Sequence, residues 1–193
     1  MSIVIAYKHD GLITFGADTQ TSFSENKMNI TNQERLKIKL IGTDFILAGV
    51  GKVRATLILS LHPEWFNLPT SEVLTKQYVV EKIVNPYFKN LADEKHELET
   101  TPSGTNEFPA SFLVGRGDRL FEIMNCGGVV EIEDVCAIGS GSDFALPCLR
   151  DPKQIQPQDR ILAALRIASR FDKYVSGPFV MMDTKDRIPS VYE

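Results

Sequence analysis

The chain has 193 residues, of which 43% are hydrophobic and 24% charged, with a formal net charge of −4 and a pI near 5.5. This composition is that of a soluble globular protein, and the length predicts one domain over residues 1–193. The acidic balance argues against nucleic-acid binding, and no apolar run approaches the ~20 residues of a membrane span. Lys8, His9 and Asp10 interrupt the N-terminus too early for a signal peptide. We therefore expect a cytoplasmic protein that binds neither nucleic acid nor membrane.

Neither the cysteines nor the histidines have the spacing of a metal site. The cysteines are odd in number and form no CxxC pair, so each is expected to be a small core residue. The histidines are scattered along the chain. No metal or other cofactor is therefore predicted. The residues concerned are Cys126, Cys136, Cys148, His9, His62 and His96.

The chain is expected to begin with a β-hairpin. Small and β-branched apolar residues predict strands over 2–7 and 12–17, and Asp10-Gly11 is a strong signal for the turn between them. Such a start ties the N-terminus directly into a sheet. The polar stretch 21–32 that follows predicts an irregular loop.

Two more strands and two helices are predicted next. Strict alternation over 36–41 indicates a half-exposed strand with lysines on its outer face, and the apolar run 45–51 indicates a strand buried on both faces. A helix then runs from residue 52 and stops before His62. A second helix is expected from an N-cap at Thr70-Ser71 to Phe88, kinked or shortened by Pro86.

The second half of the chain repeats this order of strands followed by helices. The polar stretch 97–107 reads as an exposed loop, and the segment 115–118 reads as a turn. Blocks of strands separated by pairs of helices predict an α+β fold, a four-layer αββα sandwich of two mainly antiparallel sheets. The later elements expected are strands over 109–114, 120–125, 129–132, 135–138, 179–183 and 190–192, and helices over 142–149 and from Pro157 to Phe171.

Ser2 is the first candidate for chemistry. Once Met1 is removed, Ser2 carries both a hydroxyl and a free α-amine, and the amine can take the hydroxyl proton. Taken alone, a serine at position two is common and carries no such meaning. Its interpretation therefore depends on the remaining chain.

Several short blocks resemble the proteasome β-type subunits, and most closely the HslV-like peptidases of the N-terminal nucleophile hydrolase superfamily. The blocks follow the family's order and similar spacings from Ser2 to about Leu149, whereas the C-terminal third matches more loosely. No single block is specific, because each is a short Gly/Ser pattern. They are Ser2-Ile3-Val4, Asp10-Gly11, Gly16-Ala17-Asp18-Thr19-Gln20, Lys37, Ala48-Gly49-Val50-Gly51 and Ala137-Ile138-Gly139-Ser140-Gly141.

The resemblance implies a role for each matching residue. Ser2 would be the nucleophile with its own α-amine as general base, Lys37 would favour the neutral amine, and Asp18 would be the counter-charge of Lys37. Gly51 would offer its backbone N–H to the oxyanion, and Ser140 would hydrogen-bond the amine. Each has an ordinary structural explanation as well: a solvated strand face for Lys37, turn residues for Asp18 and Gly51, and a helix N-cap for Ser140.

Three features depart from the family pattern. The nucleophile is Ser rather than Thr, and without the γ-methyl that restrains χ1 it should be slower. The family places an aspartate three residues before a Ser-Gly pair, but here Lys173 holds that place before Ser176, and Asp172 stands one position earlier. Asp172 would serve only if the loop is reshaped. Finally, the mechanism requires that Met1 be removed.

The leading prediction is a threonine-type peptidase that uses Ser2 to hydrolyse polypeptide substrates inside a homo-oligomeric ring. The ring, and an AAA+ unfoldase ATPase as a partner, are implied by the resemblance alone. Two other functions remain open: a catalytically silent proteasome-like subunit that serves assembly, and a small-molecule amidase on the same fold.

Overall fold

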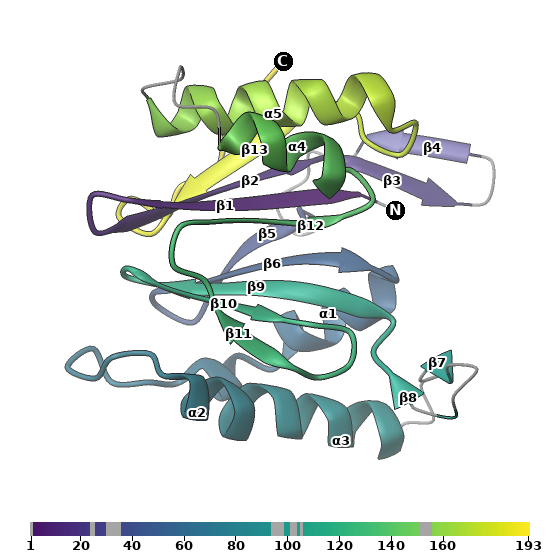
Figure 1. Cartoon of the computed structure of the whole chain (residues 1–193). Helices are drawn as coiled ribbons and strands as arrows, with labels where there is room; N and C mark the ends of the chain where they lie inside the picture. Colours follow the sequence, from purple (N-terminus) through teal and green to yellow (C-terminus); the bar gives the residue numbers. More distant parts are fainter. Residues whose placement is uncertain are drawn as a thin grey trace.

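Two five-stranded antiparallel sheets lie face to face between outer layers of helices (Figure 1). The computed structural model describes residues 2–23, 26–29, 36–93, 99–100, 104, 106–150 and 156–193. The predicted four-layer αββα sandwich is therefore confirmed. Three apolar cores fill it, one between the sheets and one between each sheet and its helices.

The first sheet contains the N-terminal hairpin and has the order β12-β1-β2-β13-β14. Asp10 and Gly11 both have positive φ, at 47° and 73°, as a two-residue type I′ turn requires. Val4 pairs with Ala17 on one side and with Ile138 on the other, so the start of the chain is held between two strands. The strands are β1 (Ile3–His9), β2 (Leu12–Asp18), β12 (Val135–Gly139), β13 (Phe179–Asp183) and β14 (Ser190–Tyr192).

The second sheet has the order β11-β10-β9-β6-β5. The central strand β6 is buried on both faces up to Val50, in agreement with its apolar sequence, and its neighbour β9 is almost as deeply buried. The strand predicted to stop before a turn at 115–118 continues through Arg116, so the turn is shorter than expected. The strands are β5 (Ile38–Ile41), β6 (Phe45–Gly51), β9 (Ala110–Arg116), β10 (Arg119–Ile123) and β11 (Val129–Glu131).

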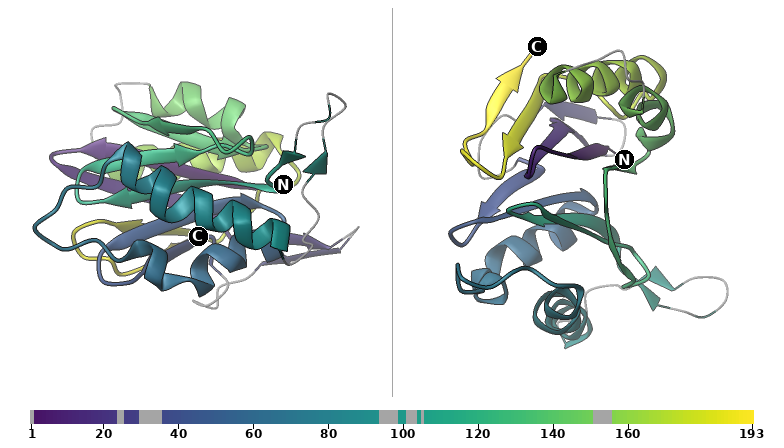
Figure 2. Two further views of the ribbon diagram at one scale, coloured as in Figure 1. Left: turned by 90° about the horizontal axis from the view of Figure 1, so that it is seen from below. Right: turned by 60° about the vertical axis from the view of Figure 1, so that its left-hand side comes forward.

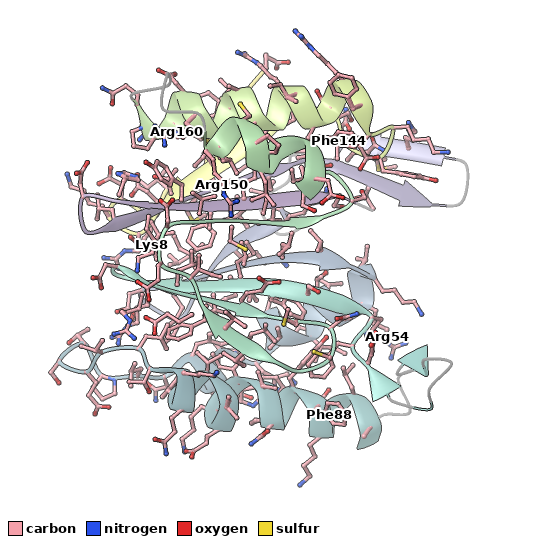
Figure 3. The ribbon with its side chains drawn as sticks, in the orientation of Figure 1. Lys8, Arg54, Phe88, Phe144, Arg150 and Arg160 are labelled. Carbon is pink, nitrogen blue, oxygen red and sulfur yellow. The ribbon has the colours of Figure 1, made fainter. Side chains whose placement is uncertain are left out.

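Each sheet is covered by helices on its outer face (Figure 2). The first sheet carries α4 and α5, and the second carries α1 and the helical segment from α2 to α3. Figure 3 shows side chains filling the space between the layers, with Phe88 and Phe144 on the outer helices. The bounds are α1 (Val53–Leu61), 3₁₀ helix η2 (Pro63–Phe66), α2 (Lys76–Tyr78), π-helix η3 (Val79–Val84), α3 (Asn85–Asp93), α4 (Ser142–Leu149) and α5 (Pro157–Phe171).

The prediction of irregular loops was wrong at two hairpins. In the stretch 21–32, β3 (Gln20–Phe23) pairs with β4 (Asn26–Asn29), while residues 30–32 lie outside the described part. In the stretch 97–107, β7 (Glu99–Thr100) pairs with β8 (Asn106–Glu107). Neither hairpin belongs to the two large sheets, so neither needs the alternating apolar residues by which a half-buried strand is predicted.

The second predicted helix begins later than expected and passes through its proline. Thr75, rather than Thr70-Ser71, is the N-cap, and its side chain accepts a hydrogen bond from the Tyr78 amide at 3.2 Å. Pro86 cannot donate to a carbonyl four residues earlier, and its ring would crowd that carbonyl. The helix accommodates it with the π-helical turn η3, after which Asn85 N donates to Val80 O.

The three cysteines differ in burial. Cys136 is buried, which agrees with its prediction as a core residue, and burial raises the pKa of its thiol to about 12. Cys148 is half-buried. Cys126 is exposed in the turn after β10, so the prediction of a core position was wrong there.

The side chain of Arg116, at the end of β9, binds the loop between α1 and α2 to the second sheet through hydrogen bonds. Its side chain is 6% exposed, and its Nε lies 2.7 Å from the Asp44 carboxylate. Its two remaining nitrogens donate to the carbonyls of Leu68, Pro69 and Glu72 at 2.7–3.0 Å. The guanidinium therefore satisfies polar groups that would otherwise be buried without a partner.

We expect Arg116→Met to destabilise the fold by about 3–5 kcal/mol, because it leaves Asp44 without its ion-pair partner and removes the hydrogen bonds to the carbonyls of Leu68 and Glu72. Urea unfolding followed by circular dichroism measures this change. Arg166→Met, on the exposed face of α5, is the matched control and should stay within about 0.5 kcal/mol of wild type. Equal effects of the two substitutions would contradict the assigned role of Arg116.

Candidate active site

The N-terminal end of β1 is fixed by a buried carboxylate. Asp18 ends β2, and its Oδ1 accepts a hydrogen bond from the backbone amide of Ile3 at 2.9 Å. Its Oδ2 accepts from the amide of Gln20 at 3.1 Å. Ser2 itself is 7% exposed. The peptide that joins Ser2 to Ile3 is therefore tied to Asp18, while Met1 lies outside the described residues.

Asp18 forms a buried ion pair with Lys37. Lys37 Nζ lies 2.6 Å from Asp18 Oδ1, and the two side chains are 13% and 0% exposed. Lys37 Nζ also donates to the backbone carbonyl of Gln20 at 2.7 Å. Since Asp18 ends a strand of the first sheet and Lys37 directly precedes β5 of the second, the pair bridges the two sheets.

Burial works against both charges of this pair. Burial raises the pKa of Asp18, and the charge of Lys37 and the amides of Ile3 and Gln20 oppose that rise. Burial likewise lowers the pKa of Lys37, and Asp18 opposes that fall. A lysine with a lowered pKa gives up its proton more readily than an exposed one. The pair thus places a buried positive charge and its counter-charge next to the amide that follows Ser2.

The Ser140 segment contacts Ser2 from the opposite side. Ser140 Oγ and the Gly141 amide both lie 3.5 Å from the carbonyl oxygen of Ser2. Gly139 has a φ of 102°, and a Cβ there would stand 2.2 Å from the same oxygen, so only glycine fits. Ser140 therefore contacts the carbonyl of Ser2, whereas the sequence predicted a contact with its amine.

Gly51 ends β6 at the same end of the sandwich as the start of β1 (Figure 1). Its φ is 125°, and a Cβ would meet the carbonyl oxygen of Pro109 at 2.4 Å, which requires glycine. The preceding Val50 lies 3.3 Å from a Cβ built on Gly139, the residue that packs on Ser2. Gly51 is exposed, and α1 begins two residues later; Arg54 marks that point in Figure 3.

Asp172 and Ser176 lie in the loop after α5, where Asp172 is buried and Ser176 contacts the β3–β4 hairpin. Asp172 is 8% exposed, and its Oδ1 accepts from the amide of Tyr174 at 2.9 Å. Its Oδ2 is buried and has no hydrogen-bond partner within the described part of the chain. Ser176 donates to Asn29 Oδ1 on β4 at 3.0 Å, so its hydroxyl is engaged by the hairpin.

The candidate residues thus gather from four segments. The structure brings Ser2, Asp18, Lys37 and Ser140 to one place: Ser140 contacts the Ser2 carbonyl, Lys37 pairs with Asp18, and Asp18 bonds to the amide of Ile3, the residue after Ser2. Gly51 is linked to them through Val50 and Gly139. A buried contributor that the sequence reading did not single out is Gln20. It is the last residue of the block Gly16-Ala17-Asp18-Thr19-Gln20, but a lone glutamine forms no periodic sequence pattern from which its role could be predicted.

No helix in the described residues has the length and apolar character needed to cross a membrane. The described residues also contain no group of three or more His, Cys, Asp or Glu side chains placed to hold a metal ion.

Comparison with known proteins finds likeness in structure but not in sequence. No protein-family model and no curated protein matches the chain. Among solved structures, Thiobacillus denitrificans BPH in complex with epoxomicin has a TM-score of 0.72 at 22% identity, over 94% of this chain and 97% of its own. HslV from Trypanosoma brucei has a TM-score of 0.64 at 20% identity, over 94% and 98%.

This chain has the N-terminal nucleophile hydrolase fold. The Gly-1 mutant of Anbu from Hyphomicrobium sp. strain MC1 has the same fold, with a TM-score of 0.74 at 15% identity over 100% of this chain and 87% of its own. At such identities the likeness establishes the fold alone. The roles of individual residues rest on the contacts described above.

We expect Lys37→Met to destabilise the fold by about 3–5 kcal/mol, because Asp18 would keep a buried charge without its partner. Asp18→Asn combined with Lys37→Met should recover roughly 0.5–3 kcal/mol relative to the sum of the single changes. Urea unfolding of the four proteins completes this cycle. Lys39→Met, two residues along the chain, is the control and should cost less than about 1 kcal/mol. Additive single changes would show that the two charges do not stabilise each other.

Proposed function

We propose that the protein is a peptidase whose nucleophile is Ser2, exposed as the N-terminal residue by removal of Met1. The observation that carries this proposal is the buried Asp18–Lys37 pair, which is bonded to the amide that directly follows Ser2. A buried lysine one hydrogen-bonded residue away from the start of the chain can lower the pKa of an N-terminal amine by its positive charge.

In this mechanism the α-amine of Ser2 takes the hydroxyl proton as Oγ attacks the carbonyl carbon of the scissile peptide. Lys37 keeps the amine neutral by its positive charge, and the Gly51 N–H stabilises the oxyanion. The protonated amine then gives its proton to the leaving nitrogen, and the C–N bond breaks to leave an ester on Ser2. A water molecule, deprotonated by the same amine, hydrolyses that ester.

Asp172 and Ser140 support the N-terminal residue in this proposal. Asp172 N bonds to Ala168 O, and both Ala168 and Ile3 pack against Gly141, whose amide contacts the Ser2 carbonyl. The buried carboxylate thus stands one helical turn from the segment that holds Ser2. Its Oδ2, which has no hydrogen-bond partner among the described residues, is a suitable acceptor for a hydrogen bond from the amine or from Ser140.

We further propose polypeptide substrates, a homo-oligomeric ring and a cytoplasmic location, with an AAA+ unfoldase as a partner. The fold shared with HslV supports this set. A ring would restrict access to the nucleophile, because an N-terminal nucleophile exposed to solvent would cleave proteins indiscriminately.

A catalytically silent subunit is the second candidate function. One observation favours it: Lys173 occupies the place where the proteasome pattern has its aspartate, and its side chain lies over the Tyr174 ring at 4.9 Å.

Hydrolysis of fluorogenic peptides separates the two candidates. We expect activity only in protein whose intact mass shows that Met1 is absent, because retained Met1 acylates the amine that serves as base. Ser2→Ala should lower kcat to background, and Ser60→Ala, on α1, is the matched control that should leave it unchanged. A fully processed protein that hydrolyses neither peptides nor small amides would favour the silent subunit, and small-amide turnover alone would favour an amidase. Equal rates for wild type and Ser2→Ala would eliminate Ser2 as the nucleophile.

We expect Asp172→Asn to lower kcat roughly 10- to 100-fold with a small effect on KM, because the amide removes a negative charge near the Ser2 amine. Steady-state kinetics across a pH series measures this effect. Asp183→Asn is the matched control, since Asp183 accepts amides of its own turn in the same way. If both variants keep the wild-type rate, Asp172 has no catalytic role.

A further inference from the structure

Gln20 contacts both members of the ion pair and a distant loop. Its amide donates to Asp18, its carbonyl accepts from Lys37, and its side-chain Nε2 donates to the backbone carbonyl of Lys173 at 3.3 Å. The residue is 2% exposed. A buried polar side chain of this kind is costly unless its hydrogen bonds are made, so the contact with Lys173 stabilises the position of both segments.

The β3–β4 hairpin, which contains Gln20, is hydrogen-bonded to the loop after α5 at several points. Gln20 and Asn29 lie directly opposite each other on β3 and β4. Gln20 bonds to Lys173, and Asn29 accepts from Ser176, three residues further along the loop. Lys27, also on β4, donates from its exposed side chain to the Lys173 carbonyl. Figure 1 shows this hairpin beside the C-terminal end of α5.

We propose that the Gln20 side chain is a positioning residue for the proposed peptidase. It fixes the 172–176 loop against the Asp18–Lys37 pair, so that water stays away from Lys37 Nζ and the Asp172 carboxylate keeps its place. This role rests on the proposed function for its effect on rate, whereas its effect on Lys37 can be observed without any substrate.

The chemistry of the position suits glutamine. Lysine or arginine would donate to the Lys173 carbonyl but would add a positive charge beside Lys37. Glutamate would add a carboxylate beside Asp18 and could not donate when ionised. The charged groups around Gln20 come from four segments: Asp18 ends β2, Lys37 precedes β5, Lys27 lies on β4, and Asp172 and Lys173 follow α5.

The decisive comparison is between Gln20→Met and Asn29→Ala. Gln20→Met keeps the length of the side chain and loses its donor, while Asn29→Ala removes a contact between the same hairpin and the same loop that does not involve Lys37. NMR titration of protein labelled with ¹⁵N-lysine follows the pKa of Lys37. We expect Gln20→Met to raise this pKa toward the ordinary value of lysine, because water reaches the ammonium, and Asn29→Ala to leave it unchanged.

Kinetics on fluorogenic peptides supply the second readout. Gln20→Met should lower kcat roughly 10- to 100-fold, with KM within about twofold of wild type, as expected for misplaced catalytic groups. Asn29→Ala should keep both constants. Should Gln20→Met fail to fold, Gln20→Asn replaces it: this variant stays uncharged but is one methylene too short to donate to the Lys173 carbonyl, so it should likewise raise the pKa of Lys37 and lower kcat.

The proposal is overturned if the pKa of Lys37 is unchanged in the Gln20 variants, or if Asn29→Ala alters it equally. The second result would mean that the loss of any contact between the β3–β4 hairpin and the 172–176 loop changes the pKa of Lys37 equally. If the wild-type protein proves inactive on peptides, the proposed function fails, yet the lysine titration still decides whether Gln20 positions Lys37.

Discussion

The arrangement of this molecule depends on a salt bridge that is unfavourable to bury. Asp18 and Lys37 come from different sheets, and neither could be withdrawn from water without the other. The backbone therefore surrounds them with further partners: the amides of Ile3 and Gln20 serve the carboxylate, and the carbonyl of Gln20 serves the ammonium. Holding these charges in place simultaneously holds the first residues of the chain, so one network determines both the packing of the sheets and the geometry of the candidate site.

Most of the sandwich follows from local sequence signals. The Asp10-Gly11 turn, the apolar strand 45–51 and the amphipathic helix after Pro157 each carry a pattern that is independent of the rest of the fold. The segments that were predicted wrongly are those whose conformation is not determined by a local sequence pattern. The polar hairpin β3–β4 is stabilised by contacts with the loop after α5, and the proline-containing helix continues because a π-helical turn relieves the crowding.

The residues of the candidate site could be proposed from the sequence because the short blocks that contain them follow one another in the family's order and at similar spacings. The resemblance to the proteasome β-type family suggested Ser2, Asp18, Lys37 and Ser140. The fold places Ser140 against the Ser2 carbonyl and the Asp18–Lys37 pair against the amide of the next residue, Ile3. Spacing alone could not show that the Ser140 hydroxyl faces a carbonyl. It also could not reveal Gln20, whose importance comes from a loop more than 150 residues away in sequence.

The peptide between Ser2 and Ile3 is bonded on both of its sides, its carbonyl to the Ser140–Gly141 segment and its amide to Asp18. None of these contacts requires a free chain end. A chain extended ahead of Ser2 can therefore keep every one of these contacts. In the proposed mechanism its fold would be intact while the Ser2 hydroxyl lacked its base, so a correctly folded protein is not evidence of a processed one.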